Sequence, residues 1–403
     1  MDAEEIASLI RGKLFPTDQL QPSYRSIFRV PKMLSRHNEK AFLPEVVSIG
    51  PFHHENTQLQ AMGNIKLEYL KCLLFRNRTT ELGCLVKAIE SIEQDCYKCY
   101  AEVVDLEREE FIEMMLIDGC FILEFLCRYQ QKRRGIVHEG EDDLVFKTSW
   151  MPRKIIADLL LLENQLPWCV LDCLFNLIPS FKTTDQQCSR LDDFVSFSFS
   201  EYKMFPTPNY SPQSHENHTH LLDCFRNCLL DGSCTVRRRE DGANILDVKF
   251  EEGIMKIPAI VIEENTESVF RNLIAFEHCD PSKGYEITSY AALLDCLIKS
   301  PADALHLKRK HILQNIGLSN EDTARLLCNN DTSFHGFLYS DLCQNVNKIC
   351  SSRWRVRAAS LRRDYLGEPW AVITFLLGII ASLGLSIIQT VFAILSYKAS
   401  SNK

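Results

Sequence analysis

The sequence predicts a mainly α-helical fold, in which a helical cytosolic domain with one short β-hairpin is followed by a single C-terminal transmembrane helix. Apolar residues recur through most of the chain at the spacing that places them on one face of a helix. Residues 245–262 instead read as two short strands around a turn. From Pro369 to Tyr397 there is no charged residue, and this length exceeds the ~20 residues that cross a bilayer.

The composition narrows the class of protein. The chain has 403 residues and an apolar fraction of 46%, which is typical of a globular protein with one large domain or two ordinary ones. Its net charge of -8 argues against a general nucleic-acid binder, which would carry a basic field. The 17 cysteines are scattered, and many lie in apolar helical runs, so we expect reduced thiols in the cytosol.

The N-terminal part is predicted to be irregular. Residues 1–22 form an amphipathic segment in this prediction, because Ile6, Leu9 and Leu14 recur at helical spacing. They lack the basic start and apolar run of a secretory signal. In residues 24–54, three prolines and one glycine interrupt any regular element.

Residues 23–340 are predicted to form the helical domain. Its run from Glu102 to Tyr129 is apolar nearly all round but carries carboxylates, which favours a buried core helix over a second membrane span. The run from Arg153 to about Leu177 is predicted to be helical, with Pro167 bending or ending a segment near its middle.

Residues 180–218 are the candidate internal loop boundary of this domain, because they are rich in polar residues and lack periodicity. We expect the segment to be partly docked and to serve as a recognition loop on a rigid scaffold. It carries aromatic residues that a disordered linker usually lacks, namely Phe194, Phe197, Phe199, Tyr202, Phe205 and Tyr210.

The C-terminal part of the domain returns to helices. A helix over residues 220–230 leads into the predicted hairpin. Helix N-caps are expected at Ser300, which precedes a proline, and at Ser319. Residues 341–368 combine an apolar stripe with basic residues and are predicted to form a juxtamembrane helix.

The transmembrane helix is predicted over residues 369–397, with a short tail at 398–403. Five arginines precede the span and two lysines follow it, so the positive-inside rule places the helical domain in the cytosol, at the plasma membrane or endoplasmic reticulum. These arginines are also predicted to contact membrane lipid: Arg353, Arg355, Arg357, Arg362 and Arg363. Four N-glycosylation sequons argue for the opposite, lumenal placement: Asn77, Asn209, Asn217 and Asn330.

Small residues recur every four positions within the span. Such a stripe favours close packing with a second helix, and we expect a homo-oligomer or a partner helix there. The alternative is that the hydroxyls bond their own helix. The stripe comprises Thr374, Gly378, Ser382, Ser386 and Thr390.

No common catalytic signature is present: the chain has no P-loop, GxGxxG, GxSxG or HExxH motif. We therefore assign no catalytic, cofactor-binding or metal-binding residue and expect no cofactor. An unrecognised enzyme site would lie near His53, His54, Asp118 and Glu163, where histidines and carboxylates in apolar sequence offer acid–base groups. The structural alternative is that these side chains satisfy backbone groups, notably at the break near Pro167.

Two patterns of cysteine and histidine residues contain side-chain types that bind metal ions. The first pattern comprises His215, His218, His220, Cys224 and Cys228. Zinc binding would account for it, and so would a polar loop that leads into a helix with one buried face. Cys96 and Cys99 form a single CxxC without a second pair or a preceding βα unit, as expected for cysteines on a helix face.

Several long motifs follow one another along the chain: IFRVPKMLSRHNEKAFLPEVVSIGPFHH, EREEFIEMMLIDGCFILEFL, DLLLLENQLPW, HLLDCFRNCLL, MKIPAIVIEENTESVFRNLIAFE, ITSYAALLDCLI and LRRDYLGEPW. In this order they resemble the plant family catalogued as domain of unknown function 247. The chain departs from the usual pattern at Phe52 and Gly63. The resemblance implies a land-plant protein with a largely helical domain and a C-terminal anchor. That family has no established activity, cofactor or catalytic residue set, although some members in grasses are associated with self-incompatibility recognition.

The sequence thus predicts a membrane-anchored protein-interaction or signalling and recognition protein with an unknown protein partner. The alternatives are an enzyme with the unrecognised site described above, or an extracellular recognition domain if the body is lumenal.

Overall fold

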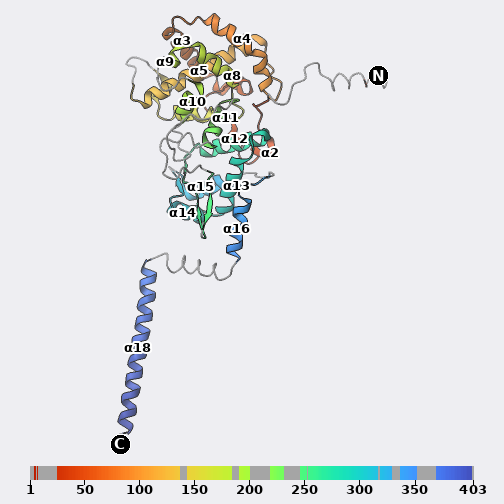
Figure 1. Cartoon of the computed structure of the whole chain (residues 1–403). Coiled ribbons are helices and arrows are strands. Elements are labelled where there is room, and N and C mark those ends of the chain that lie inside the picture. The colour runs from red at the N-terminus through yellow and green to blue at the C-terminus, as the bar shows by residue number, and fades with distance from the viewer. Residues whose placement is uncertain are drawn as a thin grey trace. The chain divides into compact units, whose positions relative to one another are not determined.

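The structure is a computed structural model, and it describes residues 4, 5, 7, 25–136, 143–183, 190–199, 218–230, 246–251, 253–315, 318–328, 336–351 and 369–401. Two compact units are present (Figure 1). The larger unit holds the described residues up to 248 and those from 257 to 339, and the smaller holds residues 249–256 and the described residues from 340 onward.

Helix α5 (Arg108–Arg133) is the centre of the first half of the larger unit. Its side chains are buried almost continuously, with Phe111, Phe121 and Phe125 fully enclosed. The prediction of a buried core helix is confirmed. The helices that pack against α5 are α3 (Ala61–Arg76), α4 (Leu82–Cys99), α8 (Trp168–Leu177) and α10 (Leu191–Phe199).

At Gly119, side chains of α8 lie close against the backbone of α5. A Cβ atom there would lie 2.6 Å from Cδ1 of Leu174 and 3.2 Å from Cγ1 of Val170. A larger side chain would therefore push the two helices apart.

The segment that precedes α3 contains only short helical pieces, as its prolines predict. These pieces are α2 (Lys32–Ser35), η2 (Glu39–Phe42), η3 (Pro51–His53) and η4 (Thr57–Leu59). The side chains of Phe42, Val47 and Ile49 are nonetheless buried, so an irregular backbone runs through the core.

Residues 151–177 do not follow the helix expected from Arg153 onward. Helix α7 (Met151–Asp158) ends at Asp158, and α8 begins only after Pro167, with the fully buried Leu159, Leu160 and Leu162 in the turn between them. The helix stops because the Asp158 side chain accepts the Val46 amide. In the turn that follows, the Asn164 side chain accepts the Ile49 amide.

Helix α10 lies in a stretch for which the sequence showed no periodicity. Leu191, Phe194 and Phe199 are buried, and α10 packs against α5, α8 and α11 (Leu221–Leu230). Residues 184–189 and 200–217 of the predicted loop lie outside the described residues.

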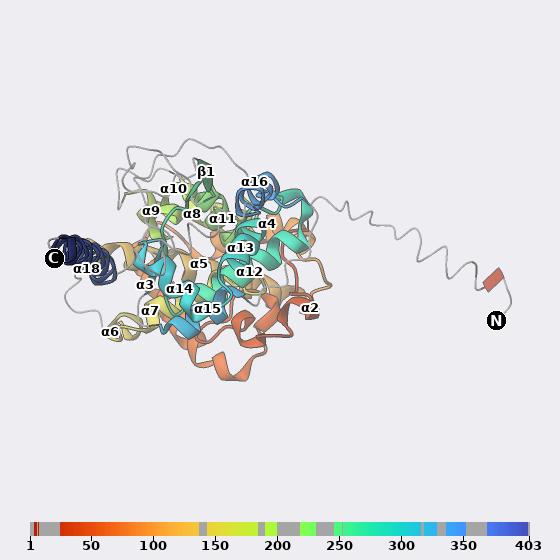
Figure 2. The same ribbon diagram turned by 90° about the horizontal axis from the view of Figure 1, so that it is seen from below.

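The second half of the larger unit is also helical. Figure 2 shows α12 and α13 side by side, and they are in contact. Both predicted caps are present, since Ser300 Oγ accepts from the Asp303 amide at 3.3 Å and Ser319 Oγ from the Asp322 amide at 3.0 Å. The elements are α12 (Thr266–Cys279), η5 (Pro281–Lys283), α13 (Glu286–Leu297), α14 (Pro301–Arg309) and α15 (Asn320–Cys328); α6 (Leu144–Lys147) and α9 (Pro179–Thr183) belong to the first half.

The predicted hairpin is confirmed. Strands β1 (Lys249–Glu251) and β2 (Ile254–Lys256) pair antiparallel around Gly253, whose φ is 81°. A second pair was not predicted: β3 (Ile260–Ile262) runs parallel to β4 (Leu313–Asn315). β4 reads Leu-Gln-Asn, a run too short to show strand alternation.

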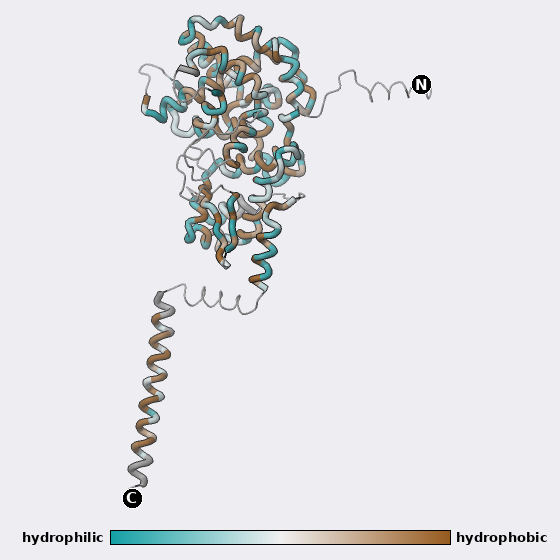
Figure 3. The backbone as a smooth tube through the Cα atoms, viewed as in Figure 1, coloured by the Kyte–Doolittle hydropathy of each residue, from teal (hydrophilic) through white to brown (hydrophobic). Residues whose placement is uncertain are grey.

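The smaller unit contains the hairpin, α16 (Ser340–Cys350) and α18 (Pro369–Ser401). Figure 3 shows the hydrophobic character of α18 along its described length. Residues Leu376–Ser396 have a mean hydropathy of 2.1 and are long and apolar enough to cross a membrane. Residues 352–368, which include the five arginines, lie outside the described part of the chain.

We predict that Gly119→Ala lowers the free energy of unfolding by about 1–3 kcal/mol, because the added methyl group overpacks the α5–α8 contact. The control is Gly63→Ala on α3, where a Cβ would meet nothing within 4 Å. Denaturant unfolding of the full chain in detergent micelles, followed by circular dichroism, measures both. Equal stability of the two variants would contradict the close α5–α8 packing.

Candidate functional site

Asp118 holds the irregular segment against the core. Its carboxylate lies on α5 and is nearly fully buried, where it pairs with the Lys66 ammonium and accepts the Gly50 amide at 2.9 Å. Lys66 also donates to the Ser48 carbonyl at 2.6 Å. Gly50 has φ of 70°, and a Cβ there would lie 2.5 Å from the Gln165 carbonyl oxygen, so only glycine fits this turn.

Asp158 and Asn164 hold the same segment a few residues earlier. Asp158 accepts the amides of residues 45, 46 and 47 at 2.7–3.0 Å. Burial raises the pKa of Asp158 to about 6 despite these three hydrogen bonds. Asn164 accepts the Ile49 amide at 2.7 Å and donates to the Val47 carbonyl at 3.0 Å.

Glu163 binds the start of the segment. It accepts the Val30 amide at 2.7 Å and the Arg29 guanidinium at 3.3 Å. Burial raises the pKa of Glu163. His53 Nε2 lies 3.6 Å from Glu163 Oε2, and burial together with the Arg29 charge lowers the pKa of His53 to about 4, so this imidazole is neutral at pH 7.

The four residues of the suggested enzyme site all lie in residues 24–54 or against them, but they do not form one cluster. The structure brings His53 and Glu163 together, whereas His54 lies 3.7 Å from Glu110. Asp118 is engaged with Gly50 and Lys66. The two carboxylates bind backbone amides, which are groups that a sequence reading cannot match to a particular side chain.

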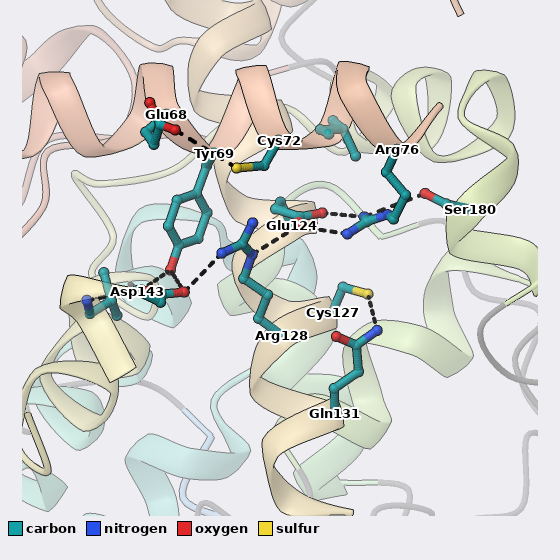
Figure 4. A network of polar contacts seen from close by, with 12 residues as sticks. Glu68, Tyr69, Cys72, Arg76, Glu124, Cys127, Arg128, Gln131, Asp143 and Ser180 are labelled. Atoms are coloured by element: carbon teal, nitrogen blue, oxygen red, sulfur yellow. Dashed lines mark hydrogen bonds and ion pairs between the residues drawn. The ribbon is translucent and has the colours of Figure 1, made fainter. Parts of the chain in front are cut away.

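A second buried network joins α3, α5 and the N-cap of α6 (Figure 4). Glu124 is fully buried between the guanidinium groups of Arg76 and Arg128. Arg128 continues to Asp143 at 3.0 Å and lies over the Tyr69 ring, while the Tyr69 hydroxyl donates to Asp143 at 3.0 Å. Two cations and two anions balance, which is the condition under which buried charges are tolerated.

A third network joins α11 to α12 and α13. Glu277 is fully buried, accepts the amides of Ile287 and Thr288 at 3.0 and 2.8 Å, and pairs with Arg226. His220 Nδ1 accepts the Asp223 amide at 3.2 Å, so its proton lies on Nε2, which faces the Ser26 carbonyl at 3.1 Å. Burial lowers the pKa of His220 to about 4.

The nominated histidine and cysteine metal ligands do not converge. Both nitrogens of His220 are hydrogen-bonded, Cys228 Sγ lies 3.1 Å from Ser196 Oγ, and His218 faces Asn227 at 3.3 Å. His215 lies outside the described residues. Within the part of the chain that the structure describes, no group of three or more His, Cys, Asp or Glu side chains is arranged to hold a metal ion.

Cys96 has a neighbour that the CxxC pattern did not reveal. Its Sγ lies 3.8 Å from Sγ of Cys169, which is 73 residues away on α8. No local spacing connects these two positions, so the sequence held no signal for the pair.

The Asn77 sequon is engaged in the fold. Its Nδ2 donates to the Leu73 carbonyl and to Ser180 Oγ, both at 2.9 Å, and the residue is buried. Nδ2 is the atom to which an N-linked glycan would be attached. The other three sequons lie outside the described residues.

Comparisons with known proteins agree with the resemblance. The profile of the plant family of unknown function, domain of unknown function 247, matches residues 27–241 and 233–383. The UPF0481 protein At3g47200 of Arabidopsis thaliana is 27% identical over 422 positions, which cover 92% of this chain and 86% of that protein. The putative UPF0481 protein At3g02645 of Arabidopsis thaliana is 20% identical over 474 positions, covering 88% of each chain. No solved structure matches the chain significantly.

We predict that protonation of His220 destabilises the fold in acid. The folded pKa of about 4 lies below the ordinary value of 6.5, so this group's contribution is fully present above pH 6.5 and is lost as pH falls toward 4. Replacing His220 by Gln should lower the slope of unfolding free energy between pH 6 and 4.5 by up to about 1.4 kcal/mol per pH unit.

Chemical denaturation of parent and variant across this pH range measures the effect, and the histidine NMR shifts of the parent give a direct second measurement. Protonation of His220 in the folded parent at pH 6.5 would contradict the assignment.

Proposed function

The chain belongs to this plant family of unknown function, and we propose that it is a membrane-anchored protein that binds another protein through its helical domain, as a recognition or signalling component. The observation that carries the proposal is helix α18. None of its span Leu376–Ser396 is buried against the protein. A helix this apolar is stable when lipid covers it.

The anchor favours membrane insertion by composition. Side chains such as Ile380, Ile387 and Phe392 are more than 60% exposed, and each contributes about -0.3 to -0.6 kcal/mol to insertion at the centre of a span. Exposure of the same apolar surface to water would be unfavourable. These values support an anchor and not a core helix.

The helical domain has the properties of a binding scaffold. Its buried polar side chains, Asp118, Glu124 and Glu163 among them, hold backbone or balance charge inside the fold. Large apolar side chains are exposed on the same domain, with Phe75 at 73% and Trp150 at 53%. Aromatic side chains of this kind commonly anchor protein interfaces.

The enzyme alternative is less well supported. It requires carboxylates that are free to meet a substrate, whereas Glu163 accepts the Val30 amide at 2.7 Å and Asp118 accepts the Gly50 amide. The feature in its favour is His53, a half-buried neutral imidazole whose Nε2 lies 3.6 Å from Glu163 and has no hydrogen-bond partner among the residues that the structure describes.

Cytosolic placement of the domain is part of the proposal. Five arginines before the span and two lysines after it favour this orientation, and basic groups next to a cytosolic leaflet attract anionic lipid. The engagement of Asn77 within the fold also supports it, because a glycan on Nδ2 would displace both hydrogen bonds.

We further propose that α18 pairs with a second membrane helix through Gly378, Ser382 and Ser386. Nothing lies within 4 Å of a Cβ placed at Gly378, so another backbone has room to approach. Ser382 Oγ donates to the Ile379 carbonyl at 2.9 Å, and a hydroxyl bonded to its own helix still leaves a small, packable surface.

We predict that the parent chain, made with microsomes, shows no mobility shift on glycosidase treatment and that added protease digests its helical domain. Replacing the five arginines before the span by glutamine should produce a glycosylated, protease-protected fraction, because the charge bias is lost. Replacing Lys398 and Lys403 by glutamine is the matched control and should leave the topology unchanged. A glycosylated parent would support the extracellular alternative instead.

We predict that chemical crosslinking in intact plant membranes links the helical domain reproducibly to a second, different protein. A chain truncated after Ser351 lacks the anchor and should lose most of this crosslink, because the membrane no longer concentrates the two proteins together. Mass spectrometry of the linked peptides identifies the contact. Crosslinks between identical chains alone would contradict the proposed heterologous partner.

A further inference from the structure

Two thiols meet where α4 packs on α8. Cys96 on α4 is fully buried, and its Sγ lies 3.8 Å from Sγ of Cys169, a half-buried residue in the first turn of α8. Neither Cys96 nor Cys169 is in a disulfide bond in this structure. The two sulfur atoms would have to approach from 3.8 Å to the ~2.05 Å of a disulfide bond.

Cys169 has the surroundings of a reactive thiol. Helix α8 begins at Trp168, so Cys169 lies in its first turn, at the positive end of the helix dipole. Hydrogen bonds from the thiols of Cys96 and Cys99 lower the pKa of Cys169, and the same hydrogen bonds raise the pKa of Cys96 and of Cys99. On the same helix, burial raises the pKa of Cys173.

We propose that Cys169 and Cys96 are a redox-sensitive pair that forms a reversible disulfide between α4 and α8. Cys169 is the thiol that an oxidant reaches, and Cys96 is the buried thiol that resolves the intermediate. The proposal is independent of the partner of the domain, because it concerns bonds within one chain.

The reaction with glutathione disulfide is balanced. The Cys169 thiolate attacks one sulfur of glutathione disulfide, its S–S bond breaks, and one glutathione leaves as the thiolate. This thiolate takes up the proton of the Cys96 thiol, and Cys96 then attacks the Cys169 sulfur of the mixed disulfide and expels the second glutathione. Two protein thiols are oxidised, and one glutathione disulfide is reduced to two glutathiones.

The disulfide bond would change how the domain unfolds. It would join two helices that both pack on α5 and close a loop between positions 73 residues apart. A cross-link of this kind restricts the unfolded chain. In a reducing compartment Cys96 and Cys169 stay as thiols, and oxidation joins them in a disulfide.

The test uses the full chain in detergent micelles, equilibrated with glutathione mixtures from fully reduced to fully oxidised, then alkylated. Trypsin cuts after Lys98 and so separates Cys96 from Cys99. We expect a disulfide-linked peptide pair that joins Cys96 to the peptide carrying Cys169, that rises with glutathione disulfide and that disappears on return to reduced glutathione. At pH 6, iodoacetamide should modify Cys169 about tenfold faster than Cys173.

Matched variants identify the sulfur atoms. Cys169→Ser and Cys96→Ala should abolish the linked pair, and Cys173→Ser, which removes a half-buried thiol one turn along α8, should retain it. If a variant fails to fold, the parent still decides the matter, because fragmentation of the linked peptides in the mass spectrometer distinguishes Cys169 from Cys173 on the one tryptic peptide that carries both. A bridge to Cys99 or Cys173, or a Cys96 peptide that stays unlinked when other thiols are oxidised, would overturn the proposal.

Discussion

The fold depends on satisfying the backbone of an irregular segment that runs through the core. Residues 45–50 lack a ladder of their own, yet Val47 and Ile49 are fully buried. Each buried amide left without a partner would cost about 1–3 kcal/mol. Asp158, Asn164 and Asp118 supply those partners at 2.7–3.0 Å from α5 and the α7–α8 turn. The same bonds end α7, fix the approach of α8 and fasten the N-terminal part of the domain to its central helix.

Sequence patterns predicted the parts of the fold that are local. Periodicity located the core helix α5, side-chain chemistry located the cap at Ser300, and the turn glycine located the hairpin. The parts that escaped prediction depend on distant partners. Helix α7 ends at Asp158 because that carboxylate accepts the amides of residues 111 to 113 positions earlier, and β3 pairs with a strand that follows three intervening α-helices.

The candidate site divides in the same way. Apolar surroundings correctly marked Asp118 and Glu163 as carboxylates in need of a partner, and backbone groups were the structural alternative, but residue types alone could not say that the amides of Gly50 and Val30 are those partners. Nor could spacing show that His220 has both ring nitrogens engaged, or that Cys169 lies against Cys96. Pairs brought together only by tertiary packing leave no local signature, and the chemistry that distinguishes this domain rests on such pairs.

The contacts of the N-terminal segment also set a schedule for biosynthesis. The Ala41 carbonyl accepts a hydrogen bond from Asn272 on α12, 231 residues later in the chain. The Val30 amide donates to Glu163, 133 residues later. At a translation rate of ~5–20 residues per second, Asn272 is added roughly 10–50 seconds after Ala41. Val47 and Ile49 gain their partners earlier, when Asp158 and Asn164 have been added, 111 and 115 residues later. The first part of the domain to be synthesised therefore completes its hydrogen bonds only after residues far along the chain have been added.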